Sequence, residues 1–276
     1  MFDSLQERLG PYALVRELAH GSTAVVHLAE DIRDGSLVAI KIADFEDQYT
    51  TAEVARLRLL FANEGSLAGR LVHPNIVRML EAQLEGPRQY IVMEYIAGVP
   101  LRHYCQPEHL LPRAQVLALM FRLARAIDYV HRCEVLHRDL KPANILLSEM
   151  GEVKIIDFGA AQIGWATRTQ LGGFLGSPAY MAPEQLLEQA PSPATDLYAL
   201  GVVLFELLTG SHPFPGDGGP GTIQRILHEA PVSLAQLAPD LPADLVRLVL
   251  RAMARDPAER YADGFSLARD LMACAR

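Results

Sequence analysis

Short apolar runs bounded by turn residues dominate the N-terminal third of the chain, and they predict strands at residues 12–18, 25–30 and 38–41. A fourth run, at residues 90–98, predicts a strand that runs into a flexible connection. Between the third and fourth of these runs, residues 51–71 carry apolar side chains at helical spacing. The apolar face consists of Val54, Leu57, Leu60, Phe61 and Leu67. This part of the chain therefore predicts a set of strands with one main helix.

Helical spacing dominates the rest of the chain. A broad apolar face predicts a helix over residues 113–132, and the longest apolar run, residues 197–208, is interrupted only by Glu206. That run is too short to cross a bilayer, which takes about 20 residues, so it predicts a buried helix. Glycine and proline are frequent in residues 213–221 and predict a surface loop.

Composition narrows the class of protein. The chain has 276 residues, half of them apolar, which suffices for one large domain or two lobes. Its net charge of −8 argues against nucleic-acid binding, which usually needs a basic face. Three scattered cysteines predict neither a disulfide framework nor a zinc site. Because the first ten residues are charged and no run is long enough to span a membrane, we expect a cytoplasmic protein without a leader or transmembrane segment.

The most polar stretch inside an apolar context is Val135–Leu146, where a charged insert separates two apolar runs. Two small strands holding a loop are expected, and the loop should line a wet cleft because burying its charges would be costly. Asp139 can accept a proton from a hydroxyl, and the amide oxygen of Asn144 can bind a hard cation. Taken alone, the same residues would also fit a charged surface turn.

The stretch His-Arg-Asp-Leu-Lys-Pro-Ala-Asn at 137–144 resembles the catalytic loop of the protein kinase family, and Lys141 resembles its Ser/Thr branch. The family's other motifs occur in the family's order along the chain: Val-Ala-Ile-Lys at 38–41, before this stretch, and Asp-Phe-Gly at 157–159 and Ala-Pro-Glu at 182–184 after it. The resemblance spans nearly all of residues 12–273, in the style of bacterial Ser/Thr kinases. It implies an α+β, bilobal fold with a small antiparallel-sheet lobe carrying one main helix and a larger, mostly helical lobe.

The resemblance also implies a nucleotide site. Lys41 would hold the α- and β-phosphates of ATP, with Glu64 as its anionic partner and Glu53 as the alternative partner. Asn144 and Asp157 would bind Mg²⁺ together with the phosphates. The remaining nucleotide-binding residues would be Ala19, His20, Gly21, Val26, Ala39, the gatekeeper Met93, the backbone of Glu94 and Ile96, and Leu146.

One motif departs from the family's pattern. The glycine-rich loop Gly-x-Gly-x-x-Gly-x-Val is represented by Gly21 and Val26 only, with Ala19 and Ala24 at the outer glycines. Glycine lets a backbone adopt positive φ and approach phosphates closely, so we expect a surviving hairpin with a tighter roof, in which the hydroxyls of Ser22 and Thr23 could reach phosphate. This departure leaves open a pseudokinase, a binding module that does not turn over.

For catalysis, the resemblance implies that Asp139 orients a Ser or Thr hydroxyl of a protein substrate and accepts its proton, while Lys141 steadies the moving phosphoryl group. Residues 160–182 would form an activation segment, in which phosphate on Thr169, or else Thr167, could dock on Arg138. Autophosphorylation there would need a transient homodimer. A small-molecule kinase is the other alternative, and the Ala-Pro-Glu motif and Arg260 argue against it.

Several further expectations concern architecture. Asp196 would accept hydrogen bonds from the catalytic-loop backbone, Arg260 would be a buried partner of Glu184, and Ser177 would bridge Asp139 and Lys141. Phe158 would pack under the Glu64 helix near Ala68, Met79 and His137. We expect a single catalytic domain over residues 1–276, with an N-lobe at about 10–95, a hinge at 94–98 and a C-lobe at 99–274. No anchor or sensor follows, which fits a free-standing kinase or a trimmed domain.

Overall fold

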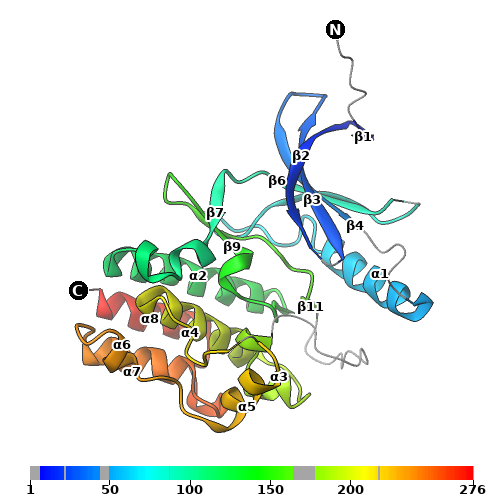
Figure 1. Cartoon of the computed structure of the whole chain (residues 1–276). Helices are drawn as coiled ribbons and strands as arrows, with labels where there is room; N and C mark the ends of the chain where they lie inside the picture. Colours follow the sequence, from blue (N-terminus) through cyan, green and yellow to red (C-terminus); the bar gives the residue numbers. More distant parts are fainter. Residues whose placement is uncertain are drawn as a thin grey trace. The chain divides into compact units, whose positions relative to one another are not determined.

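The computed structural model describes residues 7–21, 23–43, 50–86, 88–163, 178–216 and 218–275. The chain divides into two units, a sheet unit within residues 1–73 and 77–97 and a helical unit within residues 74–76 and 98–276 (Figure 1). The predicted fold class is confirmed, since an antiparallel sheet with one helix is followed by a mostly helical part.

The sheet unit is built on a six-stranded antiparallel sheet with the strand order β1-β2-β3-β4-β6-β5. Its main helix, α1, spans Thr51–Gly65. One face of the sheet buries an apolar cluster that includes Tyr12, Leu14 and Ile40. The strands are β1 Arg8–Leu9, β2 Tyr12–His20, β3 Ala24–Asp31, β4 Leu37–Ala43, β5 Met79–Gln83 and β6 Tyr90–Glu94.

Helix α1 has a well-formed start and an earlier end than predicted. The side chain of Thr50 accepts a hydrogen bond from the N–H of Glu53, whose carboxylate accepts one from the N–H of Thr50 at 2.8 Å, and this reciprocal cap fixes the first turn. The prediction of helix up to residue 71 is wrong. Leu67 and Leu71 are buried as their apolar character suggests, but turns bury them, and Gly69 adopts a left-handed φ of +73° that helix cannot accommodate.

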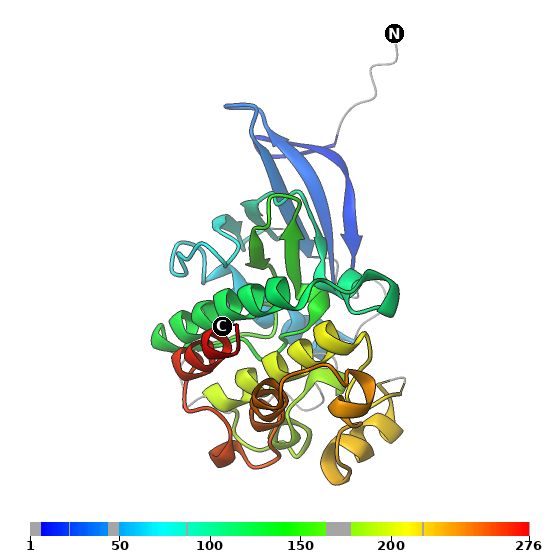
Figure 2. The same cartoon turned by 90° about the vertical axis from the view of Figure 1, so that its left-hand side faces the viewer.

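The helical unit packs α2 against α8 and α4 (Figure 2). The start of α8 approaches α2 so closely that only glycine fits there. A Cβ on Gly264 would lie 2.3 Å from the carbonyl oxygen of Ala124 in α2. The helices are α2 Arg113–Arg132, α3 Pro183–Leu186, α4 Pro193–Thr209, α5 Pro220–His228, α6 Leu234–Leu237, α7 Ala243–Ala252 and α8 Gly264–Cys274.

Two small sheets complete the helical unit. One has the order β10-β9-β7, and the other pairs β11 with β8. The expectation that two strands bracket the polar loop at 137–144 is met by β8 and β9, but these strands do not pair with each other and belong to different sheets. The strands are β7 Gly98–Pro100, β8 Val135–Leu136, β9 Ile145–Ser148, β10 Val153–Ile155 and β11 Gln162–Ile163.

Helix α4 is the centre of the helical unit's core, and the prediction of a buried helix there is confirmed. Every residue from Leu197 to Leu208 is buried, including Tyr198 and Glu206. The loop predicted at 213–221 ends earlier than expected, because α5 already begins at Pro220, where the fixed φ of proline suits the first helical position. Within the described ranges, each helix is too short or too polar to span a bilayer.

Candidate active site

Four of the predicted nucleotide-binding residues of the sheet unit share one face of the sheet. Val26 is paired with Lys41 across β3 and β4, and Ala39 is paired with Met93 across β4 and β6. Cross-strand partners point to the same side of a sheet, and so do residues two apart on one strand. Val26, Ala39, Lys41 and Met93 therefore lie on one face, opposite the apolar cluster around Ile40.

Lys41 makes the predicted contact with Glu64. The Lys41 Nζ atom lies 2.9 Å and 2.7 Å from the two carboxylate oxygens of Glu64. The Glu64 side chain is 2% exposed and that of Lys41 is 15% exposed, so the pair is largely withdrawn from solvent. The alternative partner, Glu53, is wrong, because its carboxylate is used in the cap of α1 at Thr50.

The loop that joins β2 and β3 closes without unusual backbone geometry. The N–H of Gly21 donates to the carbonyl of Ala24 at 2.9 Å, and among the described residues of this loop none adopts a positive φ. Ala24 is buried, whereas Ala19 and His20 are exposed. The hairpin has therefore formed with alanine at both outer positions, and the left-handed conformation that glycine would permit is not used. Ser22 lies outside the described residues.

The next predicted contacts to adenine lie at Glu94, at the end of β6, and in the connection that follows it. The N–H of Glu94 donates to the carbonyl of Arg78 at 3.0 Å, and the N–H of Arg78 donates to a carboxylate oxygen of Glu94 at 2.8 Å. The backbone N–H of Glu94 is therefore engaged within the sheet unit. Met93 is buried and Ile96 is half-buried.

In the helical unit, the loop at 137–144 holds the carboxylate of Asp139 in place. Lys141 Nζ lies 2.7 Å from Asp139 Oδ2, and the amide nitrogen of Asn144 donates to the same oxygen at 3.0 Å and to the backbone carbonyl of Asp139 at 2.9 Å. Two neighbours thus orient the carboxylate from its own loop. These contacts fix the direction from which the Asp139 carboxylate could accept a hydrogen bond from a hydroxyl.

The loop is drier than predicted. His137 is fully buried and Asn144 is 7% exposed, so the expectation of a wet loop holds for neither residue. Burial lowers the pKa of His137 despite the nearby acidic groups, which favours a neutral ring. The His137 ring packs against Phe158, with 4.7 Å between centroids, as expected from the sequence.

Asp196 clamps the backbone of this loop, as predicted. Its carboxylate accepts hydrogen bonds from the N–H groups of His137 at 2.9 Å and Arg138 at 2.8 Å, and it lies 2.8 Å from His131 Nε2. Burial would raise the pKa of Asp196, but the hydrogen bonds with His131 and with the backbone N–H of His137 outweigh it and hold the pKa below its ordinary value. Arg138 adopts a φ of +67°, and the clamp stabilises this strained conformation.

Asn144 and Asp157 are linked through one backbone bond. The N–H of Ile156 donates to the carbonyl of Asn144 at 3.0 Å, which holds the strand end that carries Asp157 beside the loop. Asp157 Oδ1 accepts a hydrogen bond from the N–H of Gly159 at 3.0 Å. Because the amide nitrogen of Asn144 faces Asp139, its Oδ1 is directed elsewhere. An amide oxygen and a carboxylate suit Mg²⁺, which usually takes few protein ligands.

The predicted brace between Glu184 and Arg260 is present. Arg260 donates from both terminal nitrogens to Glu184 at 2.8 Å and 2.7 Å, and its side chain is fully buried. The remaining N–H groups of Arg260 reach the carbonyls of Ala194, Ala254 and Arg255. Thr195 donates a further bond to Glu184 at 2.9 Å.

Comparison with known proteins decides the family. The family model described as "Protein kinase domain" matches residues 12–272. The chain belongs to the protein kinase family. Membership implies the use of ATP as phosphoryl donor.

Three relatives of this kinase domain are bacterial. It is 36% identical over 263 residues to the serine/threonine-protein kinase PrkC of Bacillus subtilis, 35% over 254 residues to the probable serine/threonine-protein kinase PknB of Lactococcus lactis, and 35% over 270 residues to the serine/threonine-protein kinase PknB of Mycobacterium leprae. These alignments cover 95%, 91% and 95% of this chain, and 40%, 40% and 42% of the relatives. The chain therefore spans about two fifths of the length of these relatives.

Two supporting residues of the kinase domain were not predicted. His131 contacts Asp196, and Gln185 in α3 donates to the carbonyl of Arg138 at 3.2 Å. A polar residue on the apolar face of the predicted helix 113–132 was the signal for His131. Gln185 had no comparable signal in its sequence neighbourhood, which mixes Glu184 with Leu186 and Leu187. Thr167, Thr169 and Ser177 lie outside the described residues.

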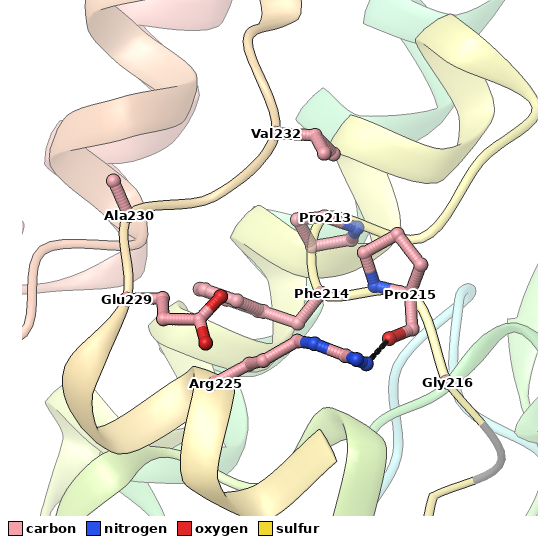
Figure 3. Close-up of a pocket in the computed structure, with 8 residues that line it drawn as sticks. All are labelled: Pro213, Phe214, Pro215, Gly216, Arg225, Glu229, Ala230 and Val232. Carbon is pink, nitrogen blue, oxygen red and sulfur yellow. Dashed lines mark hydrogen bonds between the residues drawn. The ribbon is translucent and has the colours of Figure 1, made fainter. Parts of the chain in front are cut away.

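A pocket of about 520 Å³ in the helical unit has none of the predicted site residues in its lining (Figure 3). It is formed by the loop after α4, by α5 and by the segment that follows α5. Figure 3 shows Arg225 reaching across its floor to the carbonyl oxygen of Pro215. The pocket is lined by Pro213, Phe214, Pro215, Gly216, Arg225, Glu229, Ala230 and Val232.

Proposed function

We propose that this chain transfers the γ-phosphoryl group of ATP to Ser and Thr hydroxyls of proteins. The observation that carries the proposal is the fixed carboxylate of Asp139, oriented by Lys141 and Asn144 in a loop whose backbone Asp196 clamps. Membership of the kinase family and the names of the bacterial relatives support the same reaction.

In this mechanism, the chain first positions the nucleotide. Lys41, held by Glu64, binds the α- and β-phosphates. The apolar side chains of Val26, Ala39 and Leu146 contact the adenine ring beside Met93, and the backbone groups of Glu94 and Ile96 bind its polar edge. Ala19, His20 and Gly21 cover the phosphates from the β2–β3 loop.

Asn144 and Asp157 would hold the metal ion. When bound, Mg²⁺ neutralises the negative charge that builds up on the phosphate oxygens during transfer. The proposal requires these two residues and Lys41 to meet the same triphosphate.

Asp139 then acts on the acceptor. Its carboxylate accepts a hydrogen bond from the substrate hydroxyl and takes the proton as the oxygen attacks the γ-phosphorus. The bond between the γ-phosphorus and the bridging oxygen breaks, and ADP leaves with that electron pair. Lys141, 2.7 Å from Asp139, stabilises the transferring group. Most of the rate enhancement comes from positioning and charge neutralisation.

We also propose autophosphorylation in the activation segment. Thr169 is the first candidate and Thr167 the second, with modification occurring between two copies of the chain in a transient homodimer. Phosphate on either residue would dock on Arg138, next to the catalytic carboxylate.

The decisive variant is D139N, which keeps the shape of Asp139 but removes its basicity. Phosphotransfer from labelled ATP with Mg²⁺ to a generic basic protein should fall by about 10²–10⁴-fold, the usual contribution of a general base. The matched control is D244N, since Asp244 is an exposed residue whose side chain is 73% accessible. Mass spectrometry of both proteins should find phosphate on Thr169 or Thr167 only when Asp139 is intact.

Equal transfer by D139N and the wild type would refute the role of Asp139. Binding of ATP without any transfer by the wild type would favour the pseudokinase instead. Transfer to a small molecule but never to protein would favour the small-molecule alternative.

A further inference from the structure

Two exposed histidines face each other on the segment that joins strand β7 to helix α2. His103 lies in the 3₁₀ turn η1, Leu101–Tyr104, and His109 ends the 3₁₀ turn η2, Pro107–His109. Their rings are stacked, with 4.2 Å between the centroids and 20° between the planes. Because both residues are exposed, the pair lies at the surface of the helical unit.

The ring nitrogens of the two histidines have no hydrogen-bond partner within the described part of the chain. The other contact of the pair is with the ring of Tyr104, which lies edge-on to His103 at 5.0 Å between centroids. This contact uses the faces and edges of the rings and leaves their nitrogens available. Neutral imidazole is the commonest metal ligand in proteins, so the unused nitrogens point to a metal as the missing partner.

The backbone beneath both rings is held in place. Leu101 is fully buried and anchors η1 in the core. On the other side, η2 meets the end of α4 so closely that a Cβ on Gly210 would lie 2.7 Å from the backbone nitrogen of Pro107. The N–H of His109 closes η2 by donating to the carbonyl of Gln106 at 2.9 Å. A ligand would therefore have to order side chains only, which keeps the cost of binding low.

A metal ion could replace the stack after modest rotations of the two side chains. A tetrahedral Zn²⁺ ion with bonds of about 2.0–2.1 Å places two imidazole nitrogens about 3.3 Å apart. The stacked rings already lie at a similar separation, 4.2 Å between centroids. The lone pair of each nitrogen lies in the plane of its ring, so each ring has to turn until both nitrogens are directed at the same ion. The exposure of both residues leaves room for this movement.

The neighbouring thiol does not join the pair. Cys105 lies between the two histidines in the sequence, but its Sγ atom donates to the carbonyl of Leu101 at 3.4 Å. Burial raises the pKa of the Cys105 thiol, which disfavours the thiolate form that binds metals. Within the ranges that the structure describes, no three side chains of His, Cys, Asp and Glu are grouped to hold a metal ion together. The two imidazoles would therefore be the protein ligands, and water would complete the coordination.

We propose that His103 and His109 form a binding site for a divalent metal of the zinc class, which joins η1 to η2 when it binds. Imidazole nitrogen suits Zn²⁺, Cu²⁺ and Ni²⁺, whereas Mg²⁺ prefers oxygen ligands. The site is therefore different in chemistry from the one proposed for Mg²⁺. The segment that it would stiffen supports the catalytic loop, because η1 packs against the 3₁₀ turn η3, Pro142–Asn144.

The experiment titrates the protein, without added histidines, with Zn²⁺ by calorimetry in the presence of excess Mg²⁺. The wild type is compared with H103F, H109F and H228F. Phenylalanine keeps a ring that can stack but has no ring nitrogen, so these variants separate coordination from stacking. His228 is an exposed histidine at the end of α5 and provides the matched control. Thermal denaturation midpoints with and without Zn²⁺ give a second readout that needs no activity.

We expect the wild type and H228F to bind one equivalent of Zn²⁺ saturably. Zn²⁺ should also raise the denaturation midpoints of both proteins, because a ligand that binds the folded state stabilises it. H103F and H109F should each bind Zn²⁺ at least about tenfold more weakly, since even the loss of a group that only orients a metal ligand costs about 10–100-fold in affinity. At the same concentration of Zn²⁺, the midpoints of these two variants should not rise.

Binding of equal strength by H103F, H109F and the wild type would place the metal on other side chains and would overturn the inference. The absence of saturable Zn²⁺ binding by the wild type would overturn it as well. Complete displacement of Zn²⁺ by Mg²⁺ would indicate oxygen ligands and would have the same consequence. None of these measurements involves phosphotransfer, so each of these failures would leave the proposed function intact.

Discussion

Two ion pairs, one in each unit, have the same chemistry and different surroundings. In the helical unit, Arg260 gives every N–H group to a fixed acceptor: two to Glu184 and three to backbone carbonyls. In the sheet unit, Lys41 meets the two carboxylate oxygens of Glu64 through a single flexible ammonium group that remains partly exposed.

The difference indicates that the two ion pairs have different roles. A guanidinium is planar and rigid, and five satisfied donors tie it to Glu184 and to two separate stretches of backbone, which suits a permanent brace. An ammonium is a compact charge on a mobile stem and can exchange or share partners at low cost. The sheet unit thus carries the pair suited to holding a ligand, and the helical unit carries the pair suited to holding the fold.

Breaking the brace should have the largest effect on stability. R260M would leave Glu184 as a buried charge without its cation and would deprive three carbonyls of their donor. We expect a loss of about 3–5 kcal/mol in the free energy of unfolding, as for other broken buried pairs. Urea denaturation followed by circular dichroism measures it.

R247M provides the control, because Arg247 forms an exposed pair with Asp244 and such pairs contribute about 0–1 kcal/mol. If R260M were no more harmful than R247M, the brace would have no structural role.

K41M should have its main effect on activity rather than on stability. It removes the charge that we propose for the phosphates, so phosphotransfer should fall about 10²–10³-fold, as when one electrostatic donor is lost from an active site. Stability should suffer less than in R260M, because the side chain of Lys41 is partly exposed whereas that of Arg260 is fully buried. Kinetics and denaturation of the same preparation compare the two. Larger damage to folding in K41M than in R260M would contradict the distinction between the pairs.

The smallest effect is expected from A24G, a change next to the nucleotide in the proposed site. Ala24 is buried and has no positive φ, so glycine would add flexibility without relieving strain. The free energy of unfolding should fall by about 0.5–1 kcal/mol, with little change in the KM for ATP. Markedly tighter ATP binding by A24G would show instead that this loop needs glycine's conformations to meet phosphate.

The sequence predicted much of the fold because apolar runs and the spacing of apolar residues are local signals along the chain. Strands β2, β3, β4 and β6 and helix α2 were found by periodicity, and the buried helix α4 by its apolar run. The end of α1 was missed, since apolar spacing continued through Leu67 and Leu71 after the backbone had left the helix. Apolar residues record that a position is buried, whichever backbone conformation buries it.

Among the predicted site residues, the sequence by itself determined the types, order and spacing of the groups, from Lys41 to Asp157. The roles assigned to them toward ATP, Mg²⁺ and substrate stay predictions. Tertiary structure alone decided that Glu64 rather than Glu53 meets Lys41 and that His137 is buried. A carboxylate looks the same in any sequence. Its charge state and its function depend on which side chains the folded backbone places within hydrogen-bonding distance.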